Sequence, residues 1–160
     1  MIICVDFDGT IVDDSHAYDD LDTPLTFLPG AREALQALVA AGHVLMLWSA
    51  RASRAGLEDP TRDPLVRAGV RSLNLARWAE QLPINRARYD QMVEFVEREL
   101  SGVFAAIDDG HAGKPSADLF IDDKAIRLGV GAWAVGWNRI AAVYGEAPGD
   151  SGYSRDGDSP

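Results

Sequence analysis

The first ten residues carry the feature that most restricts how this chain can fold. Four apolar residues, 2–5, lead directly into Asp6 and Asp8, and Gly9-Thr10 follows as a turn. Residues i and i+2 of an extended chain project to the same face, so the two carboxylates meet at one end of a buried strand. Carboxylates that close repel each other unless a cation or a proton lies between them. We therefore expect a divalent-metal site there, with one carboxylate free to attack and one free to move protons.

The rest of the chain alternates helical and strand-like patterns. Apolar spacing predicts helices over 31–41, 72–81 and 89–100, with Pro83 separating the last two. Apolar runs predict strands over 44–48, 103–107, 119–121 and 130–135, and a short helix or edge strand over 140–144. Such alternation indicates a parallel sheet covered on both faces. We expect an α/β, Rossmann-like three-layer αβα sandwich, with its active site at the carboxyl ends of the strands.

The length of 160 residues indicates one domain, which we place over residues 1–145. Within it, residues 52–88 form either a small lid or a peripheral insertion. The Gly-, Ser-, Asp- and Pro-rich segment 146–160 is expected to be a disordered tail. Few residues separate Asp109 from the strand at 119. Either a loop alone makes that crossing, or the strand placed at 103–107 lies elsewhere.

Composition limits the partners and the cellular location that we expect for the protein. The net charge of −10 argues against a nucleic-acid partner, although a local basic groove remains open. The single cysteine, Cys4, lies in an apolar strand and is interpreted as a core residue. One cysteine cannot form a disulfide within the chain, which favours a reducing, cytoplasmic location. No segment reaches the roughly 18 apolar residues of a membrane span, so we expect no membrane partner.

The N-terminal run resembles the nucleophile motif DxDG[TV] of the haloacid-dehalogenase-like (HAD) phosphohydrolases. Other family features follow in the family's order over residues 1–130. They are Pro29-Gly30 opening a helix, Ser49 at the end of the second strand, Lys114 at the third motif, and the acidic pair Asp122-Asp123 at a strand end. The run Ala117–Asp123, "ADLFIDD", matches the last motif of the small capless members.

This resemblance implies a Mg²⁺-dependent phosphomonoester hydrolase that works through an aspartyl-phosphate. Asp6 is the implied nucleophile, and Asp8 is the implied general acid and then general base. Magnesium prefers hard oxygen ligands. The family pattern supplies them from the Asp6 carboxylate, the Asp8 backbone carbonyl and Asp122, with Asp123 either direct or through water.

The resemblance also implies residues that hold the phosphoryl group. Ser49 would donate a hydrogen bond to a phosphoryl oxygen, and Lys114 would neutralise charge on the transferring group. Backbone amides of Phe7 and Ala50, together with the amide of the second aspartate, would cradle the remaining oxygens. Arg51 directly follows this segment and is a candidate for binding a phosphate or a second anionic group of the substrate.

Several assignments have a competitor within the chain. Asp108-Asp109-Gly110 also ends an apolar strand and imitates the acidic motif, although choosing it would place Lys114 after the acids. Lys124 competes with Lys114 for the role of catalytic lysine. His16 and His111 are weaker candidates for substrate contacts. The acidic group Asp13, Asp14, Asp19, Asp20 and Asp22 is interpreted as a solvated loop.

Caps decide substrates among these enzymes, and neither usual cap position holds enough chain for one. The site is therefore expected to be open, so that a large substrate or a neighbouring subunit of a homo-oligomer supplies the missing walls. The substrate itself is not identified. A phosphotransferase of the same fold and a non-catalytic phosphate-binding or signalling domain remain alternatives. A dehalogenase normally lacks the second acid, so Asp8 argues against it.

Overall fold

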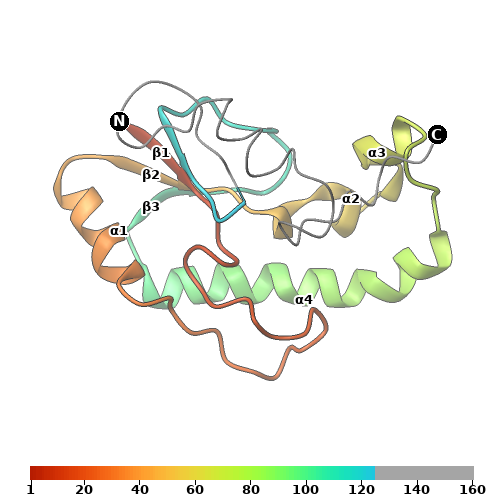
Figure 1. Cartoon of the computed structure of the whole chain (residues 1–160), viewed down its shortest axis with the longest axis horizontal. Helices are drawn as coiled ribbons and strands as arrows, with labels where there is room; N and C mark the ends of the chain where they lie inside the picture. Colours follow the sequence, from red (N-terminus) through yellow and green to blue (C-terminus); the bar gives the residue numbers. More distant parts are fainter. Residues whose placement is uncertain (125–160) are drawn as a thin grey trace, which may run out of the picture. The chain divides into compact units, whose positions relative to one another are not determined.

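The computed structural model describes residues 1–124, and its centre is a four-stranded sheet (Figure 1). The strands are β1 (Ile2–Val5), β2 (Val44–Leu47), β3 (Phe104–Ile107) and β4 (Leu119–Ile121). Their order is β3-β2-β1-β4, and every neighbouring pair is parallel. This confirms the predicted α/β, Rossmann-like class with a central parallel sheet. The described residues contain no large cap domain.

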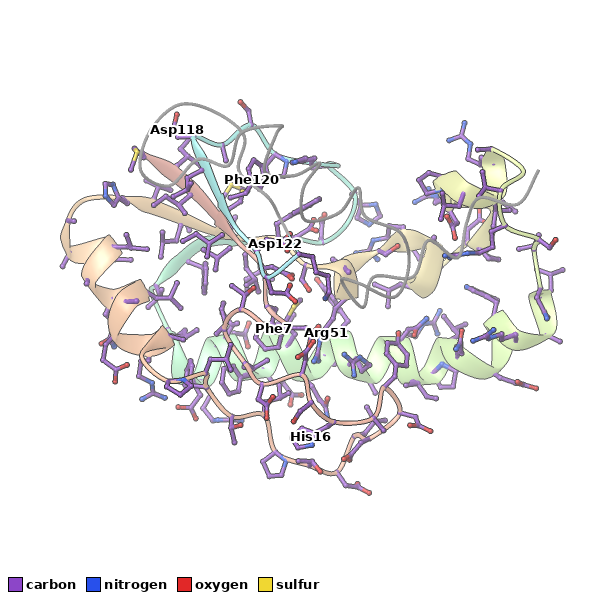
Figure 2. The ribbon with its side chains drawn as sticks, in the orientation of Figure 1. Phe7, His16, Arg51, Asp118, Phe120 and Asp122 are labelled. Carbon is purple, nitrogen blue, oxygen red and sulfur yellow. The ribbon has the colours of Figure 1, made fainter. Side chains whose placement is uncertain are left out.

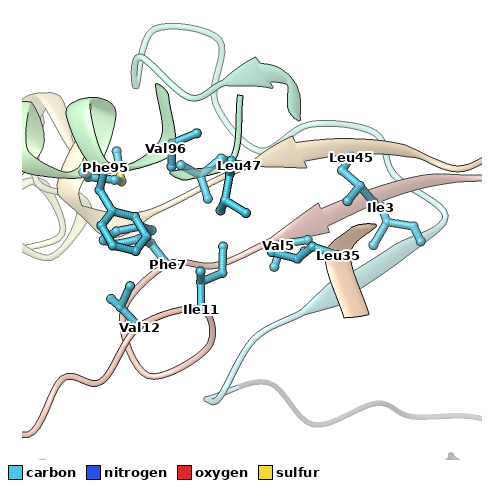
Figure 3. Close-up of a cluster of buried hydrophobic side chains, with 12 residues drawn as sticks. Ile3, Val5, Phe7, Ile11, Val12, Leu35, Leu45, Leu47, Phe95 and Val96 are labelled. Carbon is cyan, nitrogen blue, oxygen red and sulfur yellow. The ribbon is translucent and has the colours of Figure 1, made fainter. Parts of the chain in front are cut away.

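Two helices pack on one face of the sheet. Helix α1 (Ala31–Ala40) connects β1 to β2, and the long helix α4 (Leu75–Glu99) precedes β3 (Figure 1). Alternate strand residues point to these helices, as the two-residue period of a strand requires. The buried cluster is Ile3, Val5, Phe7, Ile11, Val12, Leu35, Leu45, Leu47, Met92, Phe95, Val96 and Leu100 (Figure 3).

Helix α4 corrects the prediction of two helices separated by Pro83, because Pro83 lies inside one continuous helix. Proline removes a backbone donor and ordinarily kinks or ends a helix. Here contacts on both sides of it hold the helix against the segment after β2. Trp78 Nε1 donates to the Ala55 carbonyl at 2.8 Å, and Asn85 Nδ2 donates to the Gly56 carbonyl at 2.9 Å. Asn74 caps the first turn through a hydrogen bond from the Arg77 N–H.

The segment 52–88 contributes short helical turns and the first half of α4. The turns are η1 (Ala50–Ala52), α2 (Arg54–Leu57), η2 (Pro60–Arg62) and α3 (Pro64–Arg67). Aspartates cap two of them: Asp59 accepts from the Thr61 N–H, and Asp63 accepts from the Leu65 N–H.

A loop without a helix makes the crossing from β3 to β4, which is one of the two possibilities left open by the sequence. Its end is fixed to β1, since the Asp118 N–H donates to the Ile2 carbonyl at 2.9 Å and the Ile2 N–H donates to Asp118 Oδ2 at 2.7 Å. The elements predicted at 130–135 and 140–144, and the tail 146–160, lie outside the described residues. Within residues 1–124, no helix has the length and apolar character that crossing a membrane requires.

Candidate active site

The register of the parallel sheet brings the predicted site residues to one edge. Val5 pairs with Leu47 on one side and with Ile121 on the other. The ladder continues beyond the strands, where the Asp6 N–H donates to the Ile121 carbonyl at 2.9 Å and the Trp48 N–H donates to the Val5 carbonyl at 3.0 Å. Asp6 therefore follows the central strand β1 at the level where β2 and β4 also end.

Three carboxylates gather at this edge. One side-chain oxygen from each of Asp6, Asp122 and Asp123 lies within 4.8 Å of the other two. Figure 2 labels Asp118, Phe120 and Asp122 in succession along the segment that contains β4. Hard oxygen donors at this spacing suit a magnesium ion, which is commonly bound by a few carboxylates and several waters. The acidic triad is thus the candidate metal site of the described residues.

The environment of Asp6 disfavours its charged form. Burial is the main cause, and it raises the pKa of this carboxyl to about 6. A hydrogen bond from the Phe7 N–H opposes the shift, while the negative charges of Asp122, Asp8 and Asp123 add to it. A cation among these carboxylates would remove the repulsion.

The turn after β1 fits closely against the acidic pair of β4. Gly9 has a φ of 69°, the left-handed region in which glycine is favoured. A Cβ at this position would lie 2.8 Å from Asp123 Oδ2, closer than side chains tolerate. The next residue, Thr10, accepts a hydrogen bond from the Asp123 N–H at 3.1 Å through its hydroxyl. The Gly-Thr pair therefore lets the turn and the acidic pair meet.

Ser49 lies just after β2 and is almost fully buried, with 6% of its surface exposed. Its Oγ accepts a hydrogen bond from the Arg51 N–H at 3.3 Å and so caps η1. A hydroxyl has one proton to donate besides its acceptor lone pairs, so this contact leaves that proton for another group. Phe7 is fully buried in the core, whereas Ala50 is exposed.

Asp8 is held by the predicted substrate-binding residue Arg51. Arg51 Nε donates to Asp8 Oδ2 at 2.8 Å, and Arg51 Nη2 donates to Asp8 Oδ1 at 2.5 Å. The guanidinium also lies 5.0 Å from the centre of the Phe7 ring. Both carboxylate oxygens of the predicted acid-base residue are therefore occupied by one arginine.

Lys114 lies over aromatic rings. Its Nζ is 4.2 Å from the centre of the Phe120 ring and 5.8 Å from that of Trp48, distances typical of cation–π contacts. The two rings meet edge to face, with their centres 6.0 Å apart. The role of Lys114 in neutralising charge on the transferring group stays a prediction, as does the choice between Lys114 and Lys124.

The competing acidic motif adopts a different role. Asp108 Oδ1 accepts from the Gly110 N–H at 2.8 Å, and Asp109 Oδ1 accepts from the His111 N–H at 2.9 Å, so both side chains stabilise a turn. Burial raises the pKa of Asp108. The clustering of Asp122 and Asp123 with Asp6 supports these two residues as the acidic pair of the site.

The acidic loop after β1 uses its side chains locally. Asp13 accepts hydrogen bonds from Ser15, and Asp20 accepts them from Thr23, and these bonds lower the pKa of both carboxyls. His16 lies on this loop, apart from Phe7 and Asp122 (Figure 2). These contacts are those of a solvated loop with internal turns.

Two residues beside Asp8 were not singled out by the sequence. Arg88 Nη2 lies 3.5 Å from Asp8 Oδ1, and Arg88 Nη1 donates to the Tyr18 carbonyl at 3.0 Å. Arg88 belongs to α4 and Tyr18 to the loop after β1. Arg88 and Tyr18 belong to no sequence motif. Their contacts near Asp8 follow from the packing of α4 against the site and are visible in the tertiary structure alone.

Comparison with known proteins gives a match among solved structures and none among protein families. No protein-family model matches it, and no curated protein matches it. One solved structure does, described as the conserved protein coded by locus from Bacteroides thetaiotaomicron. It is 28% identical, the match covers 97% of this chain and 98% of that one, and the TM-score is 0.37.

Proposed function

We propose that the protein is a Mg²⁺-dependent phosphomonoester hydrolase of the HAD type. The observation that carries the proposal is the gathering of Asp6, Asp122 and Asp123 within 4.8 Å, at the carboxyl edge of a parallel sheet. Asp8 follows Asp6 on the same strand end. A nucleophile, an acid-base group and a set of hard oxygen ligands are what two-step phosphoryl transfer requires.

The proposed reaction proceeds in two balanced steps. An Asp6 carboxylate oxygen attacks the phosphorus and the ester P–O bond breaks. Asp8, which enters this step as the carboxylic acid, gives its proton to the departing alkoxide oxygen. In the second step Asp8 takes a proton from water as that water attacks the phosphorus of the aspartyl-phosphate. The P–O bond to Asp6 breaks, inorganic phosphate leaves, and both aspartates return to their starting states.

The acidic triad fits a magnesium ion, because its three carboxylates repel one another and are hard oxygen donors. When bound, the ion would supply positive charge to the nucleophile and to the oxygens of the phosphoryl group. Asp6, Asp122 and Asp123 would hold it, with the Asp8 backbone carbonyl as a further ligand. The hydrogen bond from the Asp123 N–H to Thr10 orients the acidic pair for this task.

The remaining residues of the site would position the phosphoryl group. Ser49 has a hydroxyl proton to donate, and its position after β2 places it beside the end of β1. Lys114 would neutralise charge that develops in the transition state. A cytoplasmic setting is proposed with this function, supported by the buried single cysteine, whose thiol pKa is raised by burial.

The decisive experiment measures hydrolysis of p-nitrophenyl phosphate by the purified chain. Activity should require Mg²⁺ and disappear with EDTA. Asp6→Asn should lower kcat by more than about 10³-fold, and Asp8→Asn by about 10²-fold or more. Asp22→Asn, in the exposed loop, is the matched control and should retain full activity. Turnover by Asp6→Asn near the wild-type rate would refute the mechanism.

A further inference from the structure

Two arginines converge on one carboxylate beside the proposed nucleophile. Arg51 binds Asp8 with both arms of its guanidinium, at 2.8 and 2.5 Å, and only 5% of the Arg51 side chain is exposed. Arg88 approaches the same carboxylate from α4, with Nη2 at 3.5 Å from Oδ1. One negative charge is therefore shared between two positive ones.

Among the described residues, Asp8 is the one carboxylate at ion-pair distance from Arg88. The Tyr18 carbonyl also holds the guanidinium in place through a hydrogen bond. The guanidinium lies 4.4 Å from the centre of the Tyr18 ring. Burial lowers the pKa of Arg88, and the positive charge of Arg51 lowers it further. An anion entering between the two arginines would favour their charged forms and so oppose both effects.

A small cavity opens at this pair. Its volume is about 200 Å³, and its lining includes Asp8, Tyr18, Ala50, Arg51, Asn85 and Arg88. Pockets for complete drug-sized ligands usually begin at about 300 Å³, so this cavity suits one group of a substrate. A groove of about 820 Å³ lies next to it and shares Ser53, Gly56 and Asn85 as lining residues.

We propose that Arg51 and Arg88 form a subsite for a second anionic group, a phosphate or a carboxylate, of the substrate. This inference rests on the proposed phosphatase function and narrows its substrates to phosphomonoesters that carry another negative charge. The guanidinium fork matches the oxygens of a carboxylate or phosphate in the way that it now matches Asp8. The incoming anion takes over the arginines. Asp8, no longer paired with their positive charges, takes a proton from solvent and faces the scissile ester as the acid.

The alternative is that both arginines only orient Asp8. The two interpretations differ in what a second anion on the substrate does. If the two arginines only orient Asp8, they stay on it, and a second anion on the substrate does not raise kcat/KM beyond the statistical factor. A binding pair favours the doubly anionic substrate, and the preference depends on Arg88, which contacts Asp8 more weakly than Arg51 does.

The test compares bisphosphates of ethane-, propane- and butanediol with the monophosphates of the same diols. Because a bisphosphate offers two equivalent ester groups, kcat/KM should favour it twofold without any subsite. With the subsite, at least one chain length should show a ratio of about tenfold or more. In Arg88→Gln this ratio should fall to about two, and in Arg88→Lys it should be intermediate, since lysine keeps the charge but loses the fork.

Arg86→Gln is the matched control, because Arg86 lies on the same helix but donates to the Leu57 carbonyl. It should keep the wild-type ratio. A ratio near two in the wild type at every chain length, or an unchanged ratio in Arg88→Gln, would overturn the subsite while leaving the phosphatase intact. Thermal melting of each variant verifies that it is folded.

Binding gives a readout that does not depend on turnover. In EDTA, calorimetric titration of the wild type should show that propanediol bisphosphate binds about tenfold more tightly than propanediol monophosphate. In Arg88→Gln the bisphosphate should bind only about twofold more tightly, which is the statistical advantage of its two equivalent phosphates. If no ester is hydrolysed but this binding difference is found, the phosphatase proposal fails and the anion subsite stands. A difference of about twofold or less in the wild type would overturn the subsite.

Discussion

The hydroxyl of Thr10 accepts a hydrogen bond from the backbone N–H of Asp123 at 3.1 Å, although the two residues are 113 positions apart in the sequence. This bond joins the turn after β1 to the acidic pair after β4. It therefore connects the strand end that carries the proposed nucleophile to the strand end that carries the other proposed metal ligands.

Thr10→Val should weaken Mg²⁺ binding, because valine has nearly the same shape but cannot accept this bond. Residues that orient metal ligands typically account for about tenfold in metal affinity, and we expect a loss of that size. Thr10→Ser keeps the hydroxyl and should bind Mg²⁺ like the wild type. Calorimetric titration with MgCl₂ measures both. A valine variant with wild-type affinity would show that the bond does not orient Asp123.

Gly9→Ala should disrupt the site as well as the turn. The left-handed φ of 69° costs a non-glycine residue about 1–2 kcal/mol, and the new Cβ would meet Asp123 Oδ2 at 2.8 Å. Gly102→Ala is the matched control: its φ is 74°, but a Cβ there has no neighbour within 4 Å. Both variants should lose thermal stability, and only Gly9→Ala should also lose Mg²⁺ binding and activity. Equal activity in Gly9→Ala and Gly102→Ala would contradict the close approach of Gly9 to Asp123.

Magnesium should stabilise the wild-type fold through the acidic triad. At a Mg²⁺ concentration about 100 times the Kd, binding to the native state alone contributes about 2.7 kcal/mol. Melting curves with and without MgCl₂ should therefore differ in the wild type and coincide in Asp122→Asn. Asp109→Asn, in the competing acidic motif, should keep the wild-type difference. The reverse pattern would transfer the metal site to Asp108 and Asp109.

The raised pKa of Asp6 gives the metal-free protein a defined pH dependence. The native pKa of about 6 exceeds the ordinary value of 3.8, so the unfolded state ionises first as the pH rises. The free energy of unfolding should fall between pH 3.8 and about 6 and then level off. In Asp6→Asn the contribution of this carboxyl is lost, so the free energy of unfolding should fall less over this range than it does in the wild type. Urea unfolding in EDTA at pH 4, 5, 6 and 7.5 measures the difference, and parallel profiles would contradict the assignment.

The lysine assignment is decided by two alanine variants. Lys114→Ala should lower kcat by about 10²-fold or more, the usual effect of losing a group that stabilises transition-state charge. Lys124→Ala should change kcat little. The contact with Phe120 also predicts a small loss of stability in Lys114→Ala, so kcat is compared at a temperature where both variants are folded. A large kcat effect in Lys124→Ala alone would reverse the assignment.

Local patterns were sufficient to predict the sheet. The apolar runs at 2–5 and 119–121 coincide with β1 and β4, and those at 44–48 and 103–107 match β2 and β3 within one residue. Asp6, Ser49 and Asp122 were predicted near one another because the carboxyl ends of parallel strands share an edge. The sheet register brings about that arrangement.

Pro83 shows where local patterns fail. Proline's preference predicted a break, but Trp78 and Asn85 bind the segment after β2 on both sides of it, and one helix results. Arg88 depends on the same helix. Nothing near it in sequence indicates a contact with Asp8, since α4 must be continuous and packed under the site before the two can meet.

Local sequence patterns define the strand ends, the order of the acidic and hydroxyl side chains along them, and the glycine that the first turn requires. These depend on two-residue periodicity and on backbone conformation, which are local properties. Long-range packing, in contrast, makes Arg51 and Arg88 share Asp8, places Lys114 over Phe120, and brings Thr10 to Asp123. Such pairs join distant segments, and their positions depend on how helices and loops pack against the sheet.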